Sequence, residues 1–146
     1  MRARLVVTLL AAAALLVAGC GGEETTGQEG ANRSKGKTLF VSGAGGQQSC
    51  GSCHTLLDAG TAGTIGPNLD QALGYSCAQG FEESTIYSGV LGQIDLAQGI
   101  MPPDLVTGQD AVDVAAYVAS VAGKDVPGCD PSGDSGGEPT TDTTSR

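Results

Sequence analysis

Two cysteines and a histidine stand together in the run Cys50-Gly51-Ser52-Cys53-His54. Thiols three positions apart can each add across one vinyl group of the same haem, and the imidazole that follows can then bind the iron as an axial ligand. This spacing is the signature of covalent, c-type haem attachment. The run therefore predicts one haem c, held through Cys50 and Cys53, with His54 on its iron.

The second axial ligand has few candidates in this chain. His54 is the only histidine, so a haem with two histidine ligands from this chain is excluded, and Met101 is the only methionine besides the initiator. The sixth ligand is therefore Met101, a weaker group, or none, and we interpret it as Met101. Pro102 and Pro103 follow it and would stiffen its loop by fixing φ. An iron with both axial positions filled leaves no place for a substrate or oxygen, which favours an electron carrier over an enzyme.

Composition limits the class of protein and its partners. The chain has 146 residues, no Trp, two Phe and three Tyr, so a prosthetic group is expected to supply much of the core. Residues 34–129 hold three lysines against nine acidic residues, a net charge of −6. Such a surface argues against nucleic acid and against direct adsorption to anionic lipid. It favours redox protein partners with a basic or neutral docking patch, while acidity that serves only solubility stays open as an alternative.

The amino-terminal segment is typical of an export signal. A basic start, Met1-Arg2-Ala3-Arg4, precedes an apolar run over 5–18 that is too short to span a bilayer. Val17-Ala18-Gly19-Cys20 resembles the lipobox of bacterial lipoproteins, although Val17 is less common than Leu at its position. We therefore expect a signal peptide over 1–19, lipidation of Cys20 and attachment to the outer, periplasmic or extracellular, face of a bacterial cell membrane. Ordinary secretion with an incidental Cys is the alternative.

The segments that flank the central region have almost no apolar side chains, and Ala31 is the only one between residues 21 and 33. Residues 20–33 are rich in Gly, Glu and Thr and are expected to form a flexible tether, and residues 130–146 a disordered acidic tail. Between them, residues 34–129 make one domain. Its patterns predict helices over 35–41, 81–90 and 109–121, with a helical turn over 53–57 and a stop at Gly123. Strand patterns are essentially absent, so the fold class is all-α.

The order of these elements resembles class I cytochrome c over residues 34–123. The resemblance consists of a helix leading into Cys-X-X-Cys-His, then Gly66-Pro67-Asn68-Leu69, then Met101-Pro102-Pro103, and a last helix with the run 113–118. It implies a cytochrome c fold, with small helices wrapped around one covalently attached haem.

The resemblance also implies roles for particular residues. Gly36 and Phe40 on the first helix would pack against Tyr117 on the last. The carbonyl of Pro67 would accept a hydrogen bond from the ring of His54. Tyr75 and Tyr87 are the two candidates for binding a haem propionate.

The remaining cysteines are Cys77 and Cys129, an even remainder in an oxidising compartment, and we predict a disulfide between them. Two free thiols, one of them available to another protein, are the alternative.

Three other functions are alternatives to an electron carrier without a small-molecule substrate. A haem-bearing subunit of a larger oxidase, dehydrogenase or reductase would use the same domain. A thiol–disulfide oxidoreductase would use Cys50 and Cys53 as its redox pair, but that motif should follow a strand. Zinc binding by Cys50, Cys53 and His54 would place three ligands within five residues.

Overall fold

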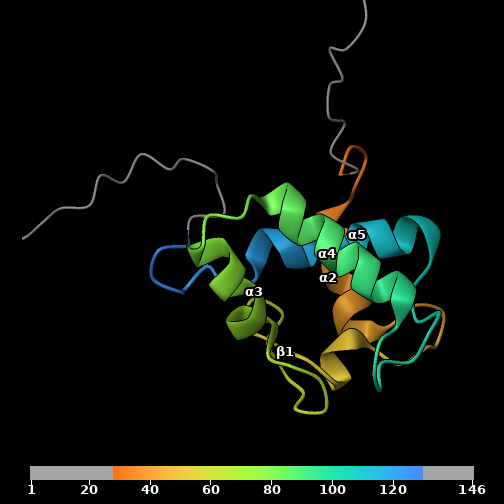
Figure 1. Cartoon of the computed structure of the whole chain (residues 1–146). Helices are drawn as coiled ribbons and strands as arrows, with labels where there is room; N and C mark the ends of the chain where they lie inside the picture. The colour runs from red at the N-terminus through yellow and green to blue at the C-terminus, as the bar shows by residue number, and fades with distance from the viewer. Residues whose placement is uncertain (1–27, 130–146) are drawn as a thin grey trace, which may run out of the picture.

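The computed structural model of the chain describes residues 28–129 and is helical, which confirms the all-α class (Figure 1). The predicted signal peptide, Cys20, residues 20–27 of the tether, and the tail lie outside the described residues. Within them, no helix is long and apolar enough to cross a membrane. The elements in chain order are α2 (Arg33–Ser42), a 3-10 turn η2 (Cys50–Ser52), β1 (Thr55–Leu56), β2 (Thr61–Ala62), α3 (Leu69–Ala78), α4 (Glu83–Leu96) and α5 (Gly108–Val121).

Three of these helices match the sequence prediction: each is longer than predicted, although α4 begins at Glu83 rather than at residue 81. Helix α2 begins before residue 35 because the side chain of Asn32 accepts a hydrogen bond from Lys35 N at 2.9 Å and caps its first turn. Helix α4 continues past Val90 to Leu96, and α5 ends two residues before Gly123, at which φ is 75°.

Helix α3 was missed, and the helical turn predicted over 53–57 was wrong. Asn68 caps α3 by accepting from Gln71 N at 3.1 Å, but the helix shows little apolar periodicity and carries Gly74 on its buried side. Residues Thr55–Leu56 are extended because they pair antiparallel with Thr61–Ala62. The side chain of Thr61 adds hydrogen bonds to His54 O and from Leu56 N. Both differences come from tertiary contacts that periodicity does not report.

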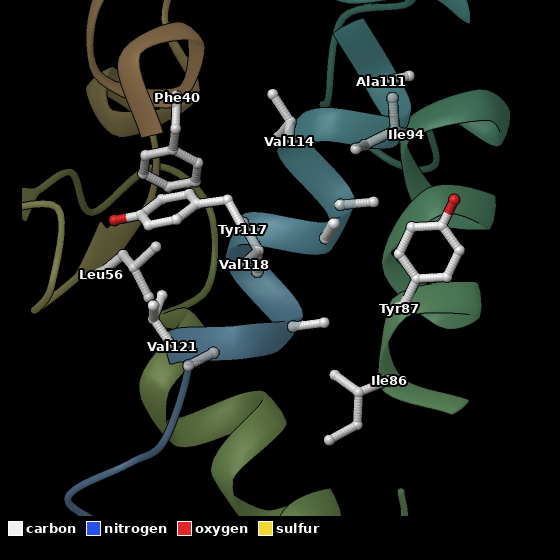
Figure 2. Close-up of a cluster of buried hydrophobic side chains, with 14 of the residues drawn as sticks. Phe40, Leu56, Ile86, Tyr87, Ile94, Ala111, Val114, Tyr117, Val118 and Val121 are labelled. Atoms are coloured by element: carbon white, nitrogen blue, oxygen red, sulfur yellow. The ribbon is translucent and has the colours of Figure 1, made fainter. Parts of the chain in front are cut away.

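Helix α5 lies in the middle of the core, between α2 on one side and α4 on the other (Figure 2). The Phe40 and Tyr117 rings meet edge to face, with centroids 6.0 Å apart and planes at 67°. On the other side, Ile86, Tyr87 and Ile94 of α4 face α5. Small alanines on α5 let both neighbouring helices approach it.

The closest approach of α2 to α5 occurs at Gly36. A Cβ atom there would overlap the backbone carbonyl of Asp113 and would lie 2.8 Å from the Cβ of Tyr117. Only glycine therefore fits this crossing, in agreement with the packing of Gly36, Phe40 and Tyr117 that the resemblance implies. Through this contact, the helix that leads into the Cys50–His54 run is fixed against the last helix.

Both ends of the described region are attached to the helices. Ala31 packs against the core, Asn32 N donates to the Asp113 carboxylate at 2.8 Å, and Arg33 forms an ion pair with Glu83. Residues 31–33, which the sequence analysis assigned to the tether, thus contact the folded domain.

At the other end, Cys77 and Cys129 form a disulfide, with Sγ atoms 2.03 Å apart, between the end of α3 and the segment after α5. The two cysteines are those for which the sequence predicts the bond.

Candidate functional site

The Cys50–His54 run forms a single tight turn. The carbonyl oxygen of Cys50 accepts hydrogen bonds from Cys53 N at 3.1 Å and from His54 N at 2.9 Å. This closes η2 and places the two thiols on one turn directly before the imidazole. Both thiols are free and partly buried. The two thiols are therefore available to bond to one planar cofactor, which the His54 ring would also contact.

The ring of His54 is oriented by the backbone of Pro67. Nδ1 of His54 lies 2.9 Å from the Pro67 carbonyl oxygen. A carbonyl can only accept, so Nδ1 carries the proton and donates it, and Nε2 keeps its lone pair for a metal. The structure thus contains the hydrogen bond that the resemblance implies.

Two glycines leave the space that this histidine occupies. A Cβ atom on Gly66 would lie 2.7 Å from Nδ1 and 3.0 Å from Nε2 of His54. A Cβ atom on Gly63 would lie 2.5 Å from the backbone carbon of Cys53. The chain therefore folds closely against the histidine-bearing turn at two points, and these positions admit no side chain without displacing it. Gly63 was not singled out from the sequence, because glycine alone does not show what approaches it.

Met101 is partly buried and packs against the hydrophobic core, and so do Leu69, Leu73, Val90 and Leu91, among others. Next to Met101, Ile100 is 74% exposed, and next to Gly66, Ile65 is 62% exposed. Apolar side chains in these places suit a large apolar cofactor. Two thiols, an imidazole with a free Nε2 and a thioether are also the donor set that haem c uses. Ligation by Met101 stays a prediction.

The two tyrosines predicted as propionate partners lie in different environments. Tyr75, on α3, is 68% exposed, whereas Tyr87, on α4, is 3% exposed, and burial raises the pKa of its hydroxyl, with a further contribution from Asp95. The choice between them stays open.

The geometry of the site does not favour thiol–disulfide exchange or zinc binding. The Cys50–Cys53 pair follows a loop rather than a strand, and burial raises the pKa of the Cys50 thiol, whereas a redox-active thiol needs a lowered one. For zinc, residues 28–129 hold no group of three or more His, Cys, Asp or Glu side chains placed to bind a metal ion.

A carboxylate just after the turn was missed by the sequence analysis. Asp58 accepts hydrogen bonds from the Tyr117 hydroxyl at 2.8 Å and from Lys37 Nζ at 3.0 Å, and these bonds lower the pKa of Asp58. Burial, followed by Asp58, raises the pKa of Tyr117. The cluster joins the turn to both α2 and α5. Its members lie 21 and 59 positions from Asp58, so no local signal identifies it.

Comparisons with known proteins identify the family of this chain. Residues 34–122 match the family model for cytochrome c. Among solved structures, the chain is similar to the c-type cytochrome SorU from Sinorhizobium meliloti, with 32% sequence identity and a TM-score of 0.44. That match covers 62% of this chain and 91% of the other. No curated protein matches the chain.

Proposed function

The chain belongs to the cytochrome c family, and we propose that it carries single electrons between redox protein partners while a lipid holds it at the outer face of a bacterial cell membrane. Members of the family bind haem c covalently and are generally electron carriers. Membership of the family does not by itself include three parts of this proposal. These are the absence of catalysis, the kind of redox partner and the lipid anchor.

One observation supports electron transfer most directly: the Cys50–His54 turn lies within the matched region, with the His54 ring donating to Pro67 O. Cys50 and Cys53 would hold the haem, and His54 Nε2 and the Met101 thioether would bind its iron. Bound in this way, the haem supplies a one-electron ferric/ferrous couple, and thioether ligation favours the ferrous state. With His54 and Met101 both bound to the iron, no position would be left for a substrate.

The acidic surface supports a partner with a basic or neutral patch. Arg33, Lys35 and Lys37 are each paired with a carboxylate of the same domain, so these cations are compensated internally. The acidic residues exceed the basic ones between 34 and 129, and the excess is left to attract a cationic partner. Association should then weaken as ionic strength rises.

Anchoring is supported by the sequence alone, through the short apolar run and the Cys20 site. Two acyl chains make a stable attachment where a single one is marginal.

The test of electron transfer is an optical spectrum of the full chain, produced together with c-type maturation machinery. We expect haem that stays attached under denaturing conditions, and a weak near-infrared Met–iron band in the ferric form. Met101→Ala should abolish that band and keep the haem attached. The matched control is Ile100→Ala, which changes the exposed neighbour and should keep the band. Absence of covalent haem would contradict the proposal.

Anchoring and docking have separate tests. Membrane fractionation should find the full chain with the membrane and Cys20→Ala in the soluble fraction. Electron exchange with a basic redox protein should slow by about tenfold or more between low and physiological salt, because the Debye length shortens to roughly 8 Å. Rates independent of salt would contradict the electrostatic part of the proposal.

A further inference from the structure

Two segments of the site run alongside each other in a fixed register. One carries His54 and continues into β1, and the other begins at Gly66 and continues into α3. Three hydrogen bonds join them, each between positions thirteen apart: Gly66 N to Cys53 O at 2.9 Å, His54 Nδ1 to Pro67 O at 2.9 Å, and Leu57 N to Asp70 Oδ2 at 2.7 Å. The His54 bond is the middle one, so its neighbours on both sides fix the distance between ring and carbonyl.

Asp70 is the only side chain of the second segment among these three bonds. Its other carboxylate oxygen, Oδ1, accepts from Gly123 N at 3.2 Å, directly after α5. One carboxylate thus joins the residue after β1, the first turn of α3 and the segment after α5. Figure 1 shows β1 beside α3, where this junction lies.

Little freedom is left between Asp70 and the carbonyl that holds the histidine. Asn68, the residue after Pro67, caps α3, and Asp70 lies in the first turn of that helix. Movement of Asp70 is therefore transmitted to Pro67 through one capped turn. A carboxylate that accepts two backbone N–H groups is a strong local anchor, because charged hydrogen bonds are about twice as strong as neutral ones.

We propose that Asp70 is a positioning residue for the axial histidine: it keeps the Pro67 carbonyl on His54 Nδ1 and thereby sets the reduction potential of the haem. This inference rests on the proposed function. A firm Nδ1–H···O bond increases the basicity of the imidazole, and a more basic ligand favours ferric iron. Loss of the Asp70 anchor weakens that bond and shifts the couple towards the ferrous state.

The test compares Asp70→Ala and Asp70→Asn with Asp125→Asn in the haem-loaded full chain. Asp125 lines the same pocket of about 510 Å³ as Asp70 but makes none of the three register bonds, so its variant removes the same charge from nearly the same place. The measurements are the reduction potential and, by NMR, the exchange rate and ¹⁵N shift of the His54 ring N–H.

For Asp70→Ala we expect the ferrous-to-ferric ratio at a fixed ambient potential to rise by up to about tenfold, or 59 mV for one electron, beyond any change in Asp125→Asn. Exchange of the His54 ring proton should be at least about tenfold faster in the same variant and unchanged in Asp125→Asn. Asp70→Asn should give a smaller effect on both, since its amide oxygen can still accept one bond.

The proposal is overturned if both Asp70 variants match Asp125→Asn in potential and in exchange rate. If Asp70→Ala does not fold, Asp70→Asn, of the same size, decides the question. A wild-type chain without haem would contradict the proposed function instead. The ¹⁵N shift of the His54 ring would in that case still show whether Asp70 controls which nitrogen is protonated.

Discussion

Removal of the Cys77–Cys129 disulfide should lower the stability of the domain without changing its fold. The bond joins α3 to the segment after α5. The two segments also touch at Gly74 and Gly123, where a Cβ atom on Gly74 would lie 2.9 Å from the Gly123 Cα. This packing and the Asp70 hydrogen bonds persist when the sulfur bridge is absent. The free energy of unfolding should therefore fall mainly because the unfolded chain gains conformational entropy.

The size of the effect follows from the length of the closed loop. The two cysteines are 52 positions apart, and the chain-entropy relation for such a loop gives about 4 kcal/mol at 25 °C. The haem-attachment residues lie outside this loop, so covalent haem does not constrain it a second time. Domains of this size are usually stable by only about 5–15 kcal/mol, so the loss is a large fraction of the whole.

The assay is denaturant unfolding of the ferric, haem-loaded domain, followed by far-ultraviolet circular dichroism. Cys77→Ala, Cys129→Ala and the double variant should each lose about 4 kcal/mol, because either substitution breaks the same bond. The slope of free energy against denaturant should rise, since the unfolded chain becomes less compact. His54 is the only histidine, so no other can bind the iron in the unfolded state. A loss under about 1 kcal/mol in the double variant would refute the loop-closure reasoning.

Three further changes test the packing and the charges. Gly66→Ala should displace the His54 ring and alter the haem spectrum, whereas Gly89→Ala, with nothing within 4 Å, should leave the spectrum unchanged and stabilise α4 by about 0.5–1 kcal/mol. Gly36→Ala should cost several kcal/mol, or prevent folding, because its Cβ overlaps the Asp113 carbonyl; thermal unfolding measures this. Burial raises the pKa of the Asp113 side chain, but its hydrogen bonds to Asn32, Gln109 and Lys35 outweigh burial, so the pKa lies below its ordinary value of 3.8. Its stabilisation is therefore present above pH 3.8 and lost as pH falls through the lower folded-state pKa, so Asp113→Asn should flatten the acid limb of a stability–pH curve.

The sequence is informative wherever the chemistry is local. The Cys50–His54 run carries the attachment chemistry within five residues, and the apolar positions of α5 show a helix directly. The sequence did not predict Asn32 as a helix cap, because the residues before it have the composition of a tether. Its hydrogen bond to Asp113 appears only in the structure.

Structure was needed wherever the partner of a residue lies far along the chain. Helix α3 has weak periodicity, since Gly74 packs against the Gly123 backbone rather than presenting an apolar stripe. The hairpin after His54 is a different case: its partners are near in sequence, but it depends on side-chain hydrogen bonds of Thr61, which no propensity scale reports.

By itself, the sequence predicted the covalent chemistry of the site: which thiols and which imidazole are present, and that this chain offers the iron no second histidine. Residue type and spacing suffice for that, because bonds to a cofactor depend on the groups at hand. Only the tertiary structure decided how the imidazole is held, through Gly66, the Pro67 carbonyl and the register that Asp70 completes. Those contacts join positions twelve or thirteen apart and extend to the segment after α5, and such distances are set by packing rather than by local pattern.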